Sequence, residues 1–195
     1  NRYQCGLTQW EGEPLKDKNI LIYAEQGVGD EIMFSSCIPD LMKQPHNRIF
    51  LECDPRLAPL FTRSFPNIHV HGKEKDPDFS WVGKHTHLDY SLPIGSLPKF
   101  FRNSVEDFPR RDSYLSPNPE LVKKWTQRLT NLDDNLKIGV SWRGGVGANT
   151  IKTHSLPLSD WQPLLSMNAS FINLQYGDTV EELARINTEQ NVMIH

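Results

Sequence analysis

The sequence lacks the features of a membrane protein, a disulfide-rich secreted protein or a nucleic-acid-binding protein. Its 195 residues contain only three cysteines, Cys5, Cys37 and Cys53, with no C-x-x-C pair, so neither a disulfide framework nor a zinc site is indicated. No apolar run approaches the roughly 18 residues of a membrane span, and residues 1–20 are too polar for a signal peptide. A net charge of −3 gives no overall basic field for nucleic acid. We therefore expect a cytoplasmic protein.

What the sequence does contain is an alternation of strand and helix patterns. Three short apolar segments at 19–25, 48–53 and 67–72 have the composition of strands buried in a parallel sheet. Between them, residues 31–43 and 55–65 have apolar positions at helical spacing, and Pro55 suits a helix start. The order β-α-β-α-β predicts an α/β fold with right-handed crossovers and a parallel sheet.

The alternation stops near the middle of the chain and then restarts, which predicts two lobes. After the restart, strands are expected at 137–142 and 170–175, and a capping box of Ser159 and Gln162 is expected to begin a helix. A third strand begins at 191, where a sheet would be left with an open edge, so we expect the second lobe to be incomplete. Four parts result: a lead-in segment at 1–18, an N-terminal Rossmann-like lobe at 19–116, a linker helix at 117–136 and a partial C-terminal nucleotide-binding lobe at 137–195.

A first glycine loop, in "IYAEQGVGDEIMF", joins the first strand to the first helix. Glycines between a strand and a helix often mark a phosphate site, but the dinucleotide fingerprint fails here because Ile32 stands at the third glycine position. Asp30 and Glu31 would also repel a pyrophosphate at a separation of a few ångströms. The loop is therefore not predicted to bind phosphate.

Asp30 has two compatible interpretations. Aspartate is among the best N-cap residues, so Asp30 is a candidate to cap the helix that follows the loop. It also follows a strand at the carboxyl edge of the expected parallel sheet, where α/β proteins bind ligands. A carboxylate there can act as a general base that removes a proton from a hydroxyl group.

A second glycine loop, after the strand at 137–142, has the opposite character. It combines glycines with basic and hydroxyl side chains, and no acid occurs between Trp142 and Asp160. Backbone amides, cations and hydroxyls together suit a diphosphate, while the alternative is a solvated loop with incidental basic residues. It is not a P-loop, because no GK[ST] follows. The candidate ligand-binding residues are Arg143, Gly144, Gly145, Lys152, Thr153, His154 and Ser155.

Two His-x-His pairs, His69 with His71 and His85 with His87, are the candidates for a metal site. Such pairs are more often solvated strand surface, and nothing in the sequence supplies a second shell for a metal. We expect no metal site.

Four motifs in order carry a resemblance to a known family: "W-x-G-x-x-L-x-x-K-x-I-L-I-Y-A-E-Q-G-x-G-D-x-I-x-F", "KIGVSWRG", "SLPL-x-x-W" and "FINLQYG". The chain resembles the glycosyltransferase-like region found behind tetratricopeptide repeats in bacterial proteins, which is similar to ADP-heptose:lipopolysaccharide heptosyltransferases. The resemblance implies a GT-B fold of two Rossmann-like lobes with the active site in the cleft. It also implies inverting, metal-independent catalysis without a cofactor, with Asp30 as the catalytic residue and the donor held around residues 143–155.

The expected function is transfer of a sugar from a nucleotide-diphosphate sugar to a hydroxyl group of a glycan or protein acceptor, within a longer protein that carries tetratricopeptide repeats. The alternative is a non-catalytic binding module on the same scaffold. We expect the isolated chain to be inactive, because a GT-B cleft needs both complete lobes. Neither nucleic acid nor a membrane is expected as a partner.

Overall fold

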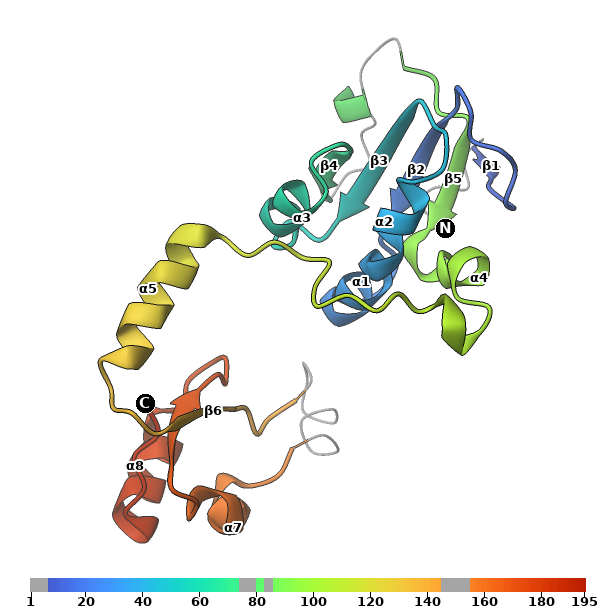
Figure 1. Cartoon of the computed structure of the whole chain (residues 1–195). Helices are drawn as coiled ribbons and strands as arrows, with labels where there is room; N and C mark the ends of the chain where they lie inside the picture. The colour runs from blue at the N-terminus through green and yellow to red at the C-terminus, as the bar shows by residue number, and fades with distance from the viewer. Residues whose placement is uncertain (1–6, 74–79, 83–85, 145–154) are drawn as a thin grey trace. The chain divides into compact units, whose positions relative to one another are not determined.

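The computed structural model describes residues 7–73, 80–82, 86–144 and 155–195, and it divides into two compact units, Asn1–Pro119 and Glu120–His195 (Figure 1). Each unit has its own sheet and its own hydrophobic core. Every strand pair within these sheets is parallel. The chain is thus an α/β protein, as its sequence predicts.

The first unit is built on a five-stranded sheet with β2 at its centre, in the order β1-β5-β2-β3-β4. All five residues of β2 are buried, in keeping with the continuous apolar run that a doubly covered parallel strand requires. Ile22 of β2 lies between Leu51 of β3 and Leu92 of β5. The strands are β1 (Thr8–Gln9), β2 (Asn19–Tyr23), β3 (Arg48–Cys53), β4 (His69–Gly72) and β5 (Tyr90–Pro93).

Helices cover one face of this sheet and enclose the main core. The helical segments are α1 (Val28–Phe34), η1 (Ser35–Cys37), α2 (Ile38–Leu41), α3 (Ala58–Ser64), η3 (Ile94–Ser96) and α4 (Pro98–Phe101). Ile38, Leu41 and Phe61 from these helices pack with the strand residues Ile20 and Ile49 in one buried cluster. The arrangement is consistent with the Rossmann-like lobe expected from the sequence.

On the opposite face of the sheet, a second hydrophobic cluster includes a short described part of the connection from β4 to β5. Its 3₁₀ turn η2 (Ser80–Val82) packs Trp81 and Val82 with Leu21 and Phe50 of the sheet. The His71 ring stacks on Trp81 with centroids 4.5 Å apart and an interplanar angle of 7°. This histidine of the first His-x-His pair therefore packs on an aromatic ring.

The segment that leaves α4 is tied to the helical layer by charge pairs. Nη2 of Arg102 lies 2.7 Å from Oδ2 of Asp40, and Nη2 of Arg111 lies 3.2 Å from the same oxygen. Both guanidinium groups also donate to the carbonyl of Ser36. The Arg102 side chain is only 5% exposed. Asp40 thus joins residues 102–111, which include η4 (Val105–Asp107), to the end of α2.

The second unit has a two-stranded parallel sheet with helices between and after its strands. Its elements are α5 (Pro119–Thr130), β6 (Leu136–Val140), η5 (Leu158–Trp161), α7 (Gln162–Leu165), β7 (Ala169–Asn173) and α8 (Val180–Gln190). The core contains Val140, Phe171 and Ile186. Beside β7, Ile194 forms a single parallel bridge with Phe171.

Several local predictions were wrong in detail. The helix expected to start at Pro55 begins at Ala58, because residues 54–57 form a turn in which Leu57 N–H donates to the Asp54 carbonyl. The capping box at Ser159 is absent, since Ser159 lies inside η5 and its hydroxyl donates to Asp160 instead. Within the described residues, no helix has the length and apolar composition needed to cross a membrane.

Candidate functional site

Asp30 lies in the first turn of α1, just beyond the carboxyl end of the central strand β2. The N-cap is Gly27, so the prediction that Asp30 itself occupies the N-cap position was wrong. Asp30 instead reaches back, and its Oδ2 accepts a hydrogen bond from Gly27 N–H at 3.1 Å. Within the described part of the chain, Oδ1 has no hydrogen-bond partner. One oxygen of the carboxylate therefore holds the loop through the amide of the N-cap residue.

Glu31 does not share the open position of Asp30. Glu31 is 3% exposed, and its Oε2 accepts a hydrogen bond from Asp54 N–H at 2.8 Å. Burial raises the pKa of Glu31 above its ordinary value, although the Asp54 amide opposes this shift. Of the two acidic residues after the loop, Glu31 is thus buried and Asp30 is partly exposed. Glu31 joins α1 to the turn after β3.

Further charged groups lie at the same edge of the first sheet. Lys73, after β4, donates to the carbonyl of Ala24 at 3.3 Å. Desolvation raises the pKa of Glu25, despite hydrogen bonds from the amides of Gly95 and Ile94. The Arg56 side chain pairs with Asp54 and lowers the pKa of Asp54 to about 2. This edge of the first sheet thus carries both cations, Lys73 and Arg56, and anions, Glu25 and Asp54.

In the second unit, Arg143 follows β6 but is already paired. Its Nη2 lies 3.2 Å from Oε2 of Glu182 and donates to the carbonyl of Asp178 at 2.8 Å. Oε1 of Glu182 also accepts a hydrogen bond from Nε1 of Trp142 at 3.1 Å. Glu182 belongs to α8, so its interactions with the residues after β6 could not be read from local sequence. Any anion bound by Arg143 must compete with Glu182.

Gln175, which the sequence analysis did not single out, organises the start of this loop. Its Oε1 accepts hydrogen bonds from Arg143 N–H at 2.8 Å, Trp142 N–H at 3.0 Å and the Ser141 hydroxyl at 3.1 Å. The residue is 8% exposed. The "FINLQYG" motif contains this glutamine, so the motif was the signal that could have identified it.

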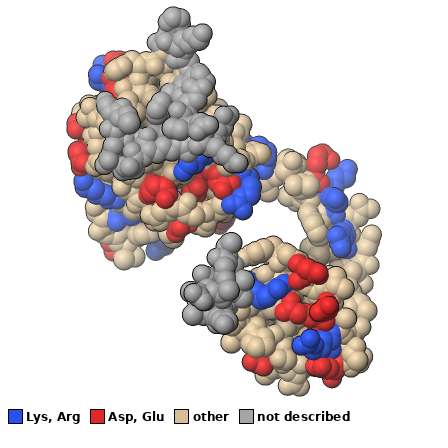
Figure 2. All heavy atoms as spheres, turned by 180° about the vertical axis from the view of Figure 1, so that it is seen from behind, with Lys and Arg blue, Asp and Glu red and all other residues tan. Residues whose placement is uncertain are grey.

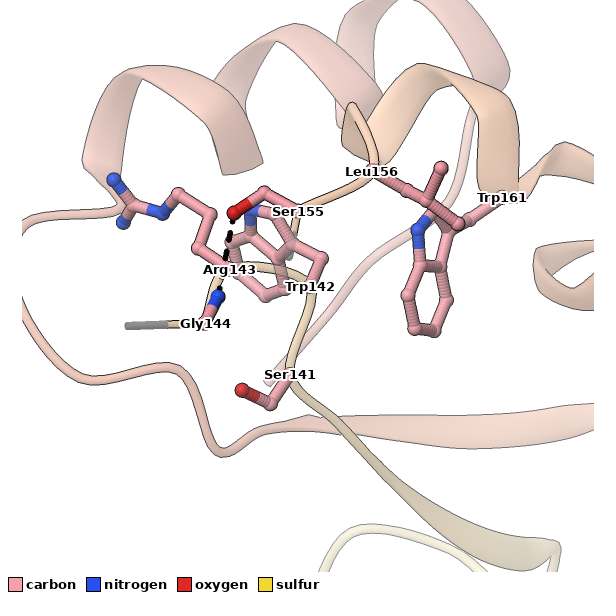
Figure 3. A pocket seen from close by; sticks show the side chains of 7 residues that line it. All are labelled: Ser141, Trp142, Arg143, Gly144, Ser155, Leu156 and Trp161. Carbon is pink, nitrogen blue, oxygen red and sulfur yellow. Dashed lines mark hydrogen bonds between the residues drawn. The ribbon is translucent and has the colours of Figure 1, made fainter. Parts of the chain in front are cut away.

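A pocket of about 400 Å³ lies where the two described ends of the loop approach each other. Gly144 N–H donates to Oγ of Ser155 at 3.3 Å across this point. Figure 3 shows the guanidinium of Arg143 and the indole of Trp161 on opposite sides of the pocket. The lining residues are Ser141, Trp142, Arg143, Gly144, Ser155, Leu156 and Trp161.

Of the predicted ligand-binding residues, the structure brings Arg143, Gly144 and Ser155 together, and the other four (Gly145, Lys152, Thr153 and His154) lie outside the described residues. On the face shown in Figure 2, Lys and Arg atoms of the second unit lie among Asp and Glu atoms. Among the described residues, no group of three or more His, Cys, Asp or Glu side chains is placed to hold a metal ion.

Comparison with known proteins gives one informative similarity. No protein-family model and no solved structure matches the chain. It is similar to Protein FlbA of Caulobacter vibrioides, with 33% identity over 204 residues. The match takes in 99% of this chain but 34% of FlbA, so the chain spans about a third of the length of that relative. The name specifies no ligand or reaction, and the similarity by itself assigns none.

Proposed function

We propose that this chain is a glycosyltransferase region of GT-B type. It transfers a sugar from a nucleotide-diphosphate sugar to an acceptor hydroxyl, with inversion and without a metal, as part of a longer protein that carries tetratricopeptide repeats. The observation that carries the proposal is the placement of Asp30. A partly exposed carboxylate with one oxygen unpartnered within the described residues follows the central strand of a parallel sheet, at the edge where α/β proteins bind ligands.

In the proposed reaction, Asp30 takes the proton from the acceptor hydroxyl. The hydroxyl oxygen then forms a bond to the anomeric carbon, while the bond from that carbon to the phosphate oxygen breaks. The nucleoside diphosphate leaves with the electron pair, and its charge needs hydrogen-bond donors or cations. Gly144 and Ser155 of the second unit, with Arg143 after release from Glu182, are the described residues proposed to meet it.

A non-catalytic binding module is the second candidate, and a specific observation favours it. Nη2 of Arg143 is taken by Glu182 and the Asp178 carbonyl, although its buried Nε has no partner among the described residues, and the amides of Trp142 and Arg143 donate to Gln175. A site whose described cation and amides already have protein partners has less to offer a departing diphosphate. If the second candidate is correct, the protein binds a ligand without catalysing its reaction.

Release of nucleoside diphosphate from ADP-, GDP- and UDP-sugars, measured in a longer protein that contains this chain, tests the two candidates. The glycosyltransferase proposal expects turnover that falls at least about a hundredfold in Asp30→Asn. Asp112→Asn is the matched control, because Asp112 is exposed and should leave turnover unchanged. Binding of a donor sugar without turnover would favour the binding module. Equal turnover in wild type and Asp30→Asn would remove the base assignment.

A further inference from the structure

Gln175 lies in the loop after β7, and its side chain contacts the loop after β6 at the carboxyl edge of the second sheet. Its backbone N–H donates to Oδ1 of Asn173 at 2.8 Å, and its Nε2 donates to the Tyr176 carbonyl at 3.2 Å. Asn173 in turn donates to Oγ1 of Thr179, the residue at the start of α8, at 3.1 Å. Both ends of the Gln175 side-chain amide are thus hydrogen-bonded, and the residue is buried.

The hydrogen bonds that Gln175 accepts orient the backbone of the residues that follow β6. Because Oε1 takes the amide hydrogens of Trp142 and Arg143, those two amides face Gln175 rather than a ligand. The next amide, Gly144 N–H, donates to Oγ of Ser155. A hydroxyl that accepts a hydrogen bond keeps its own hydrogen to donate. In the described part of the chain, that hydrogen of Ser155 has no acceptor.

We propose that Gln175 is a positioning residue for the diphosphate part of the nucleotide. This inference rests on the proposed function and adds a residue to the same site. Gln175 does not touch the ligand. It acts through the backbone of Trp142 and Arg143, which sets Gly144 and hence the Ser155 hydroxyl in place as a donor to a phosphate oxygen.

The competing explanation is a polar link that only stabilises the second unit. A buried amide without an acceptor is costly wherever it occurs, so loss of stability in a Gln175 variant would not distinguish the two. Ser170 offers a matched comparison in the same strand region. It lies near the amino end of β7, is 5% exposed, and its hydroxyl donates to Oδ2 of Asp133. Loss of the Ser170 hydroxyl should destabilise the second unit without altering the loop after β6.

The experiment is isothermal titration of a longer protein that contains this chain with ADP, GDP, UDP and CDP, below the unfolding transition of every variant. Gln175→Met keeps the length of the side chain and removes the strong acceptor. We expect it to weaken binding of whichever diphosphate the wild type prefers by about tenfold or more, while Ser170→Ala binds within about twofold of the wild type. An equal loss in both variants would show a general effect of stability and overturn the inference.

A second variant tests the proximity of Gln175 to the phosphates. Gln175→Glu keeps an oxygen acceptor for the two amides but places a negative charge beside the site. We expect weaker diphosphate binding that recovers as salt rises from about 50 to 500 mM, because salt screens the repulsion. Gln127→Glu, an exposed change on α5, should show no such recovery.

The outcomes separate the inference from the function on which it rests. If the wild type binds a diphosphate and both Gln175 variants bind it equally well, only the positioning role is overturned. If the wild type binds none of the four diphosphates, the proposed donor site is overturned, and the positioning role with it.

Discussion

The carboxylate of Glu182 neutralises the guanidinium of Arg143 at 3.2 Å. The two side chains are 32% and 34% exposed, so water partly screens the pair. A diphosphate that approaches Arg143 meets the repulsion of Glu182 as well as the attraction of the arginine.

Replacing Glu182 with Gln should therefore strengthen nucleoside diphosphate binding, by about threefold given the modest strength of an exposed pair. The amide oxygen of the new side chain can still accept the hydrogen bond from Trp142 Nε1. The control is Glu181→Gln, a neighbouring exposed position in the first turn of α8, which should leave affinity unchanged. Weaker binding in Glu182→Gln, measured by titration calorimetry, would mean that the pair holds Arg143 in its productive position.

Asp30 should contribute to stability and to catalysis through different oxygens. Asp30→Asn retains an acceptor for Gly27 N–H, so we expect the free energy of unfolding to change by less than about 0.5 kcal/mol. Asp30→Ala loses the acceptor and should cost about 1 kcal/mol, the usual value of a helix-terminal cap. Urea unfolding of the first unit measures both. Equal stability of the two variants would show that the bond to Gly27 contributes nothing.

Glu31 should make stability depend on pH in the direction set by its raised pKa. A carboxyl group with a raised folded pKa contributes stability below its unfolded pKa of about 4.3, and this contribution is lost as the pH rises through the folded pKa. Glu31→Gln keeps an acceptor for Asp54 N–H and cannot ionise. It should therefore be more stable than the wild type at pH 7, with the difference shrinking toward pH 4. Asp112→Asn should show no such gain, and a less stable Glu31→Gln at pH 7 would contradict the prediction.

Asp40 should behave in the opposite way. Burial raises its pKa, but hydrogen bonds from Lys43 and Arg102 outweigh burial and hold the pKa below its ordinary value. Asp40→Ala leaves the buried Arg102 guanidinium without its carboxylate, which should cost about 3 kcal/mol at pH 7. A depressed folded pKa gives stability above the unfolded value of about 3.9, and this is lost as the pH falls through the folded pKa.

The difference between wild type and Asp40→Ala should therefore narrow below pH 4. Lys43→Met serves as the control, because Lys43 is the exposed partner of the same carboxylate and should matter by less than about 0.5 kcal/mol. A difference that stays constant from pH 7 to pH 3 would show that the loss in Asp40→Ala comes from packing rather than charge.

The central strands β2 and β3 were predictable from sequence because each is a short apolar run, whereas the polar β1 (Thr8–Gln9) lies in the segment expected to be a lead-in. The strand predicted at 48–53 is β3, and the one predicted at 19–25 is β2, which ends at Tyr23. The place of Asp30 at the carboxyl edge followed from the order of strand, turn and helix. The burial of Glu31 could not be predicted, because it depends on the turn after β3.

Local sequence also could not predict that groups of the second glycine loop already have hydrogen-bond partners within the protein. Arg143 has its partner in α8, and its amide has its acceptor in the loop after β7. A pattern of glycines and cations indicates which groups are available to an anion, but it cannot show which of them the folded chain has already used. Contacts between distant segments decide that.

The central position of β2 determines which parts of the first unit open to solvent least often. Leu21 and Ile22 lie between β3 and β5, so their amide hydrogens should be among the last to exchange with solvent, and those of the short edge strand β1 should exchange much earlier. The carboxylate of Asp30 is thus attached to the part of the sheet that opens least often. Edge strands and surface turns can accumulate substitutions while the carboxylate of Asp30, which we propose as the base, keeps its place.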